Sequence, residues 1–252
     1  MRYIINAVLI FRQLIFLGYA GIVLFLFGTV SPLLYFLRAP RSLVIRMPHF
    51  WSLLWHIGIF FILWVKIEVK GGQNIPKKPC IYVCKHQSKF ETFFLNKVLP
   101  RSVFVFKQEL LSSPFLGWGL KYSGNIAVDR TKGVKALKDV IKYGKEKLAN
   151  GISVIIFPEG TRAKAKEHPK FHKSGLMLAN ASGGDVVLVA HNSANILPTG
   201  DKALKVGSIK VVMPGKIKIV ISEPIDARNY NLTELNDYCY NWIKEQMIIL
   251  EK

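Results

Sequence analysis

Acidic side chains are scarce in this chain. Its 252 residues include 16 Asp and Glu against 35 Lys and Arg, which gives a formal net charge of +19. An excess of this size attracts polyanions, and the two common ones are nucleic acid and the anionic surface of a bilayer. The sequence has no zinc-finger spacing, no RNP pattern and no recognisable helix-turn-helix, so it lacks the usual signs of nucleic-acid binding. We therefore expect no nucleic-acid partner.

Cysteine is rare as well. The chain has three, Cys80, Cys84 and Cys239, and no two of them form a C-x-x-C pair. An odd number without paired spacing argues against a disulfide framework or a zinc site, and it makes a reducing cytosol the default compartment. Cys80 and Cys84 lie in an apolar run, where we expect them to be small core residues.

Formal charge is absent from two long stretches near the start of the chain. Gln13–Leu37 has 25 residues and Met47–Val65 has 19. At about 1.5 Å of rise per residue, the first stretch is long enough to cross a hydrocarbon core of about 30 Å, and the second just reaches that length. We therefore predict that residues 1–65 form a membrane-associating segment of two helices.

The positions of basic and aromatic residues indicate how this segment meets a membrane. Arg38, Arg41 and Arg46 separate the two stretches, so a hairpin with both ends in the cytoplasm would export three arginines. Tryptophan and histidine residues mark the second stretch as interfacial. We expect a re-entrant or in-plane pair of helices at the cytoplasmic face of an inner or equivalent membrane. A single span followed by an amphipathic helix is the alternative.

Residues 66–252 have the pattern of one α/β domain. Apolar, β-branched runs predict strands at Lys66–Lys70, Ile81–Val83, Val103–Phe106, Asn125–Val128, Ser153–Phe157, Val186–Ala190 and Lys216–Ile221. Helical patterns occur at Lys89–Val98, Val134–Ala149, Lys173–Ala181 and Thr233–Leu250. Strands that are apolar throughout and separated by helices are typical of a parallel sheet covered on both faces. We expect a mostly parallel, open sheet of about seven strands flanked by helices.

Polar or charged residues follow the five central predicted strands. They are Lys85–His86, Lys107, Asp129–Arg130, Glu159 with Arg162, and His191–Asn192. In open α/β sheets the ligand lies beyond the carboxyl ends of the strands. The series therefore predicts a shared basic pocket that contains an imidazole.

Several catalytic signatures are missing. The chain has no G-x-S-x-G elbow, no G-x-G-x-x-G, no P-loop and no H-E-x-x-H. Their absence leaves a serine hydrolase, a dinucleotide enzyme, a P-loop NTPase and a zinc protease without support. We expect neither a cofactor nor a metal.

One remaining candidate is an imidazole with a carboxylate five residues further on. Neutral His86 can accept a proton at cellular pH, and a carboxylate on its other nitrogen would fix the tautomer. Residues i and i+5 do not share a helical face, so His86 must lie in the turn before a helix and Glu91 in its first turn. The alternative is that Glu91 only caps the helix that Ser88 starts.

A second motif follows the strand predicted at Ser153–Phe157. Residues 157–162 read F-P-E-G-T-R. Pro158 removes a backbone donor and Gly160 permits an unusual turn. Such a turn can present Arg162 to a phosphate in bidentate fashion, whereas a turn that only ends a strand needs neither charge.

These motifs resemble the 1-acylglycerol-3-phosphate acyltransferase family of the glycerolipid acyltransferase superfamily. His86 and Glu91 match its His-x4-Asp block, with Glu in place of the usual Asp. Residues 124–130 and 157–162 resemble the second and third blocks. Residues 187–190 resemble the fourth, but a leucine stands where proline is common. The order and spacing agree over about residues 65–200.

The resemblance implies direct acyl transfer without an acyl-enzyme. His86 would deprotonate the sn-2 hydroxyl of lysophosphatidate as it attacks the thioester of acyl-ACP or acyl-CoA, and Glu91 would orient His86. The product would be phosphatidic acid for phospholipid synthesis. Substrates and an anionic membrane surface are the partners implied, with acyl carrier protein as one possible donor.

The resemblance also implies a substrate-binding set. Arg130 and Arg162, with Lys107, would neutralise the substrate phosphate. Glu159 would position the glycerol end or the side chain of Arg162. Gly160 and Thr161 belong to the same turn and complete the set.

Two other activities stay open. The chain is alternatively an acyltransferase for glycerol 3-phosphate or another lysophospholipid. The alternative from another class is a non-catalytic module that binds anionic membranes. His191, at a strand end, is expected to be structural. His168 and His172 lie in a basic loop, Ala163–Lys173, that contacts either solvent or, alternatively, lipid headgroups or the acidic acyl carrier.

Overall fold

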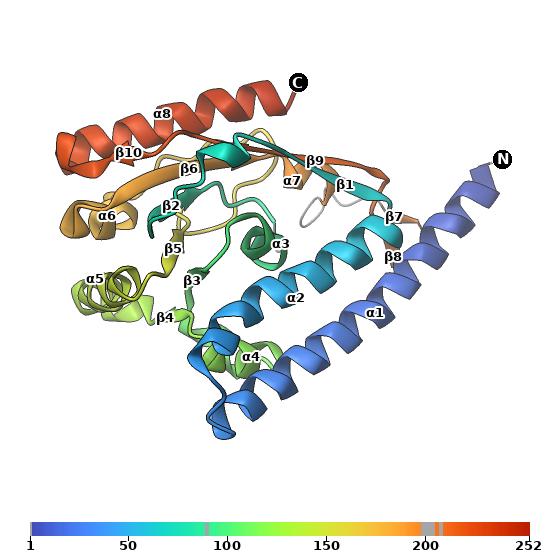
Figure 1. Ribbon diagram of the computed structural model, residues 1–252. Coiled ribbons are helices and arrows are strands. Elements are labelled where there is room, and N and C mark those ends of the chain that lie inside the picture. Colours follow the sequence, from blue (N-terminus) through green and yellow to red (C-terminus); the bar gives the residue numbers. More distant parts are fainter. Residues whose placement is uncertain (1, 89–90, 198–204, 207–208) are drawn as a thin grey trace.

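The computed structural model describes residues 2–88, 91–197, 205–206 and 209–252 (Figure 1). Residues 89 and 90, where the third predicted helix begins, lie outside this part of the chain. The α-helices are α1 (Arg2–Phe36), α2 (Arg41–Phe61), α3 (Glu91–Val98), α4 (Leu116–Tyr122), α5 (Val134–Ala149), α6 (Met177–Ser182), α7 (Ser193–Ile196) and α8 (Leu232–Leu250). The strands are β1 (Val65–Lys70), β2 (Ile81–Cys84), β3 (Ser102–Lys107), β4 (Ile126–Val128), β5 (Ser153–Ile156), β6 (Asp185–His191), β7 (Lys205–Val206), β8 (Ile209–Lys210), β9 (Gly215–Ile221) and β10 (Ile225–Asp226). Short 3-10 helices include η2 (Gln108–Ser112), η3 (Arg130–Lys132) and η4 (Lys173–Leu176).

The main sheet is mostly parallel. Its strands lie in the order β1-β9-β6-β2-β5-β3-β4, and β10 pairs with β6. Among the described strands of this sheet, only the pairs β6–β9 and β6–β10 are antiparallel. The predicted fold class and the seven predicted strands are confirmed, with β10 as an addition. The strands β6, β2, β5, β3 and β4 are parallel neighbours, so their carboxyl ends lie along one edge, as predicted.

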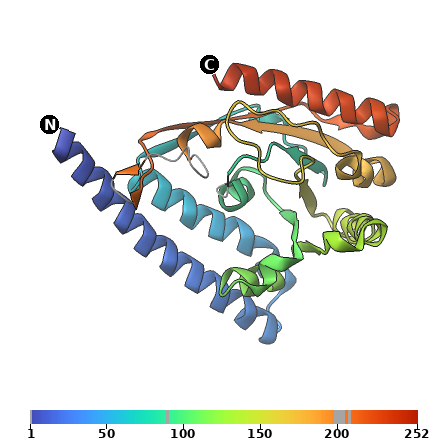
Figure 2. The ribbon, with the colours of Figure 1, turned by 180° about the vertical axis from the view of Figure 1, so that it is seen from behind.

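Two hydrophobic layers cover the sheet. Alternate residues of β2 point to opposite faces, so Ile81 and Val83 join one cluster while Tyr82 and Cys84 join the other. The first cluster lies under α5, α6 and α8, and the second lies under α2 and α3. Figures 1 and 2 show α8 on one side of the sheet and α1, α2 and α3 on the other. Central strands buried on both faces explain the runs that are apolar throughout.

The helix α1 leaves much of its apolar surface uncovered. It contacts α2 and α4, yet large side chains such as Phe11, Leu17 and Ile22 are more than half exposed. Of the described helices, it alone is long and apolar enough to cross a membrane. The helix α1 begins before Gln13, where the predicted charge-free stretch starts, so it also includes Arg12. The second stretch forms α2, which packs on α3 and β1.

Arg12 is a buried charge inside this apolar helix. Its Nε donates to the carbonyl of Ile62 over 2.9 Å, and its Nη2 donates to the carbonyl of Leu63. The guanidinium carbon also lies 4.1 Å from the ring centroid of Trp64. The last carbonyls of a helix lack intrahelical partners, and a cation there also suits the helix dipole. Arg12 thus joins α1 to the end of α2.

We expect Arg12→Met to destabilise the protein. The substitution removes the charged donors but does not shorten the side chain much. The change leaves two buried carbonyls without a charged donor, which costs about 2 kcal/mol or more. For a chain of this size the midpoint of thermal unfolding in detergent should fall by about 4–8 °C. The matched control is Arg38→Met, since Arg38 is exposed. An equal shift for both variants would contradict the role of Arg12.

Candidate active site

A cavity of about 530 Å³ opens where the carboxyl edge of the sheet meets the helical layer. Its polar part is lined by His86, Lys107, Arg130, Gly160, Thr161 and Arg162. Six of the eight predicted site residues therefore line one cavity. The other two, Glu91 and Glu159, are buried beside it.

His86 occupies the turn between β2 and α3. Its ring stacks on Phe157, with ring centroids 4.3 Å apart. Its Nδ1 pairs with Oε1 of Glu91, the first residue of α3. This is the geometry that the five-residue spacing requires. Because Nδ1–H donates to the carboxylate, Nε2 is the nitrogen left to accept a proton.

Glu91 is fully buried and accepts several hydrogen bonds. The backbone N–H groups of Gln87 and Ser88 donate to it over 2.9 and 2.8 Å, and the Ser193 hydroxyl donates over 3.2 Å. Burial acts to raise the pKa of Glu91, but the hydrogen bonds it accepts, that from His86 first among them, outweigh burial and hold the pKa below its usual value. Glu91 therefore caps the turn and pairs with His86, so the two predicted roles coexist.

Glu159 joins the third motif to the first. Its Oε1 lies 2.5 Å from Nζ of Lys85, and its Oε2 accepts the backbone N–H of His86 over 2.6 Å. Burial raises the pKa of Glu159, and the Lys85 ammonium opposes this. Glu159 thus contacts Lys85 and the His86 backbone, and its predicted role of positioning the glycerol end or the side chain of Arg162 stays a prediction. The sequence placed Lys85 beside His86 at the end of this strand but gave it no partner; a lysine directly after the apolar run of β2 was the available signal.

The basic residues come from three different strand ends. Lys107 ends β3, Arg130 starts η3 after β4, and Arg162 closes the turn after β5. Nη1 of Arg130 donates to the carbonyl of Gly160. Gly160 has φ +71°, a left-handed conformation that a residue with a Cβ adopts only with strain. All three cationic side chains are exposed at the cavity, so they remain available to an anionic ligand.

The other part of the cavity is apolar and was not predicted. Its lining includes Phe27, Trp51, Trp55, Phe93, Leu116 and Leu120, which come from α1, α2, α3 and α4. Close packing brings α4 against α1: a Cβ on Gly119 would lie 2.2 Å from the ring of Phe27. The glycines in the segment before β4 were the available signal for this contact. The cavity therefore offers cations at one end and an apolar surface at the other.

The remaining histidines lie outside the described lining of this cavity. His191 is fully buried, and its Nε2–H donates to the carbonyl of Lys85 over 2.8 Å. Burial lowers the pKa of His191, which favours the neutral, structural state that the sequence suggested. Burial also lowers the pKa of His168, whose Nε2 lies 3.7 Å from Oε2 of Glu251. His172 is exposed beside Gly160.

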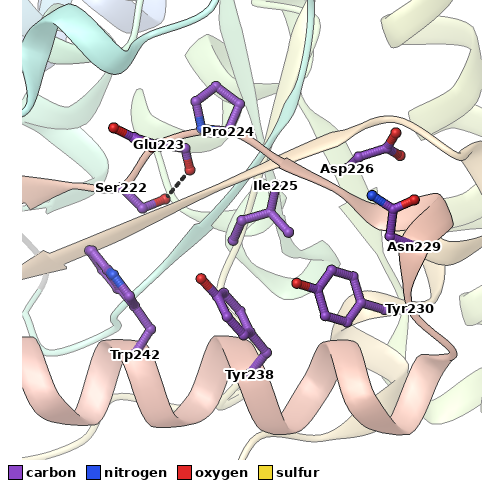
Figure 3. A pocket seen from close by; sticks show the side chains of 9 residues that line it. All are labelled: Ser222, Glu223, Pro224, Ile225, Asp226, Asn229, Tyr230, Tyr238 and Trp242. Carbon is purple, nitrogen blue, oxygen red and sulfur yellow. Dashed lines mark hydrogen bonds between the residues drawn. The ribbon is translucent and has the colours of Figure 1, made fainter.

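A second hollow lies between α8 and the segment that joins β9 to β10 (Figure 3). Its volume is about 440 Å³, and it is lined by Ser222, Glu223, Pro224, Ile225, Asp226, Asn229, Tyr230, Tyr238 and Trp242. The rings of Tyr238 and Trp242 rise from α8 toward that segment. These lining residues include no base of the imidazole type and no cation. The first cavity is therefore the candidate active site.

Comparison with known proteins decides the family. A sequence model of the family described as "Acyltransferase" matches residues 66–198. The chain is 37% identical over 230 residues to the 1-acyl-sn-glycerol-3-phosphate acyltransferase of Pseudomonas aeruginosa, which covers 88% of this chain and 85% of that protein. The chain belongs to the acyltransferase family. The predicted family resemblance is thus confirmed.

Two further proteins are similar to this acyltransferase, one by its solved structure and one by its sequence. The crystal structure of the 1-acyl-sn-glycerophosphate acyltransferase PlsC from Thermotoga maritima superposes with a TM-score of 0.79 at 27% identity, covering 100% of this chain and 98% of that one. A chloroplastic 1-acyl-sn-glycerol-3-phosphate acyltransferase from Brassica napus is 29% identical over 205 residues, which cover 80% of this acyltransferase and 56% of the longer plant protein.

We expect Glu91→Gln to destabilise this acyltransferase in a pH-dependent way. The lowered pKa means that the folded state binds fewer protons than the unfolded chain, whose glutamates titrate near ~4.3. The stability that this carboxylate contributes is therefore fully present above about pH 4.3 and is lost as the pH falls through the lower folded pKa. At pH 7 the loss should be about 1–3 kcal/mol, because buried donors lose their charged acceptor.

The measurement is the midpoint of thermal unfolding of the wild type and the variant between pH 3 and pH 8. The difference between them should be constant at neutral pH and shrink below about pH 4. Glu109→Gln is the matched control, because Glu109 is exposed. A difference that stays the same at every pH would show that the charge of Glu91 does not matter to folding.

Proposed function

We propose that this acyltransferase transfers a fatty acyl group from acyl-ACP or acyl-CoA to the sn-2 hydroxyl of 1-acylglycerol 3-phosphate, forming phosphatidic acid. The observation that carries the proposal is a single cavity that holds the His86 imidazole, three cationic side chains and an apolar half. A lysophosphatidate has matching parts: a dianionic phosphate, a free hydroxyl and an acyl chain. The names of the relatives support the same substrate class.

The proposed reaction is a direct transfer. Nε2 of His86 takes the proton of the lipid hydroxyl while its oxygen attacks the thioester carbonyl carbon. The C–S bond then breaks, and the leaving thiolate takes the proton from the imidazolium, so the products are an ester and a thiol. Glu91 holds Nδ1–H and stabilises the imidazolium that forms in between.

The cations have a separate role in this proposal. Arg162 and Lys107, together with Arg130, neutralise the phosphate, and this holds the hydroxyl beside His86. The apolar lining from α1, α2 and α4 receives acyl chain. The exposed apolar surface of α1 supports insertion at a membrane, and we place the domain on its cytoplasmic face, where basic segments are favoured.

We expect His86→Ala to abolish most turnover while substrate binding survives. Loss of a general base typically costs about 10²–10⁴-fold in rate. The assay is release of thiol from acyl-ACP and from acyl-CoA, each tested with lysophosphatidate and with glycerol 3-phosphate. Lysophosphatidate-dependent release by the wild type that His86→Ala lacks supports the proposal.

Other outcomes of the same assay select the alternatives. Release only with glycerol 3-phosphate indicates that acceptor instead. No release with any combination indicates a non-catalytic membrane-binding module. Retained turnover in His86→Ala rules out this residue as the base.

We expect Arg162→Gln to weaken substrate binding more than catalysis. A hydrogen bond to a charged group contributes about 1.5–3 kcal/mol, which corresponds to about a ten- to hundredfold rise in KM for lysophosphatidate. The KM for the thioester should change little, because that donor does not use the same phosphate contact. Arg228→Gln is the control, since Arg228 is exposed and pairs with Asp226 at the second hollow. An unchanged KM for lysophosphatidate would remove Arg162 from the phosphate site.

A further inference from the structure

Glu251, the residue that follows α8, lies unexpectedly close to the catalytic turn. Its Oε1 accepts a hydrogen bond from Nε2 of Gln87 over 3.1 Å. The same oxygen accepts the backbone N–H of Lys166 over 3.0 Å. The side chain of Glu251 is only 5% exposed, although the residue ends a surface helix. It therefore joins the far end of α8 to two segments that border the cavity.

Gln87 connects this carboxylate to the catalytic pair. It directly follows His86, it is fully buried, and its backbone N–H donates to Oε1 of Glu91. That oxygen is the one that pairs with Nδ1 of His86. A shift of the Gln87 side chain would therefore move a backbone group that holds the catalytic carboxylate.

The hydrogen bond to Glu251 also stabilises Lys166 itself, because the backbone of Lys166 is strained. Its φ is +63°, a left-handed conformation that costs energy for a residue with a Cβ. The loop around it is also tied to the catalytic turn, since Nζ of Lys85 donates to the carbonyl of Glu167 over 3.0 Å. The bond from Lys166 N–H to Glu251 thus holds a strained point of the loop that begins just after Arg162.

The position of Glu251 is fixed by the core, not by the cavity. Leu235, Cys239, Ile243 and Met247 bury one face of α8 against the sheet. A carboxylate at the carboxyl end of a helix meets the negative end of the helix dipole, which is unfavourable. Among the described residues, the groups that face this carboxylate are the Gln87 amide, the Lys166 N–H and His168, and all three belong to the catalytic turn or to the loop that follows Arg162.

We infer that Glu251 is a positioning residue for catalysis, which acts through Gln87 on the His86–Glu91 pair. The inference rests on the proposed function, because its effect is defined on acyl transfer. It assigns α8 a role beyond covering the sheet: α8 carries a fixed carboxylate to the turn that holds the base.

The first test compares two substitutions of Glu251 in the full chain, measured as thiol release with lysophosphatidate. Glu251→Ala should lower kcat about tenfold or more, while KM for lysophosphatidate changes less than about threefold. Glu251→Gln should stay within about threefold of wild type, because an amide oxygen accepts the same two donors. Glu245→Ala, an exposed residue of the same helix, is the control that should leave kcat unchanged.

The second test exchanges the two interacting groups. Gln87→Glu places two carboxylates against each other and should lower kcat about tenfold or more. Adding Glu251→Gln restores an amide–carboxylate pair and should bring kcat back to within about threefold of wild type. This rescue separates positioning from general loss of structure, since a merely destabilised fold gains nothing from a second substitution.

Three outcomes would overturn the inference. They are a Glu251→Ala enzyme within twofold of wild type, a Glu251→Gln enzyme as impaired as Glu251→Ala, and a double variant no better than Gln87→Glu alone. Failure of the proposed function gives a different result, because the wild type itself would then release no thiol with lysophosphatidate.

Discussion

The site depends on the way two buried carboxylates hold one histidine residue, by its side chain and by its backbone, at the edge of the sheet. Glu91 pairs with the His86 side chain, while Glu159 accepts the His86 backbone N–H. A carboxylate removed from water must be surrounded by donors or cations, since an unpaired buried charge is very unfavourable. Glu91 meets this need with backbone and hydroxyl donors, and Glu159 meets it with Lys85. The resulting network fixes the tautomer of His86 and the direction in which Nε2 faces.

The cavity beside this network combines two environments that come from different parts of the chain. The parallel strands bring the cations together, because their carboxyl ends share one edge. The apolar half is built mainly by α1, α2 and α4, so the helices that expose apolar surface also line the cavity. Arg12 couples α1 to the end of α2, and this makes the apolar wall a fixed part of the structure. A ligand that spans the cavity therefore contacts both the sheet domain and the helices that expose apolar surface.

Two departures from the family pattern have local physical explanations. Glu91 is one methylene longer than aspartate, and it reaches His86 from the first residue of α3 while still capping the turn. Leu188 occupies the place where proline is common. Its backbone N–H donates to Oγ of Ser222 over 2.9 Å, and a proline has no N–H to make this bond. The leucine thus lets β6 pair with the segment that follows β9.

By itself, the sequence determined the seven main strands, the α5 and α8 helices, and the identity of the imidazole and the arginines. Those features rest on local periodicity and on motif spacing, which act over a few residues at a time. Tertiary structure alone decided that Glu159 turns toward Lys85, that α4 packs on α1, and that Glu251 reaches Gln87. These contacts join residues 74, about 90 and 164 positions apart. Their partners are selected by burial and by the need to satisfy buried charge, and neither can be read from neighbours along the chain.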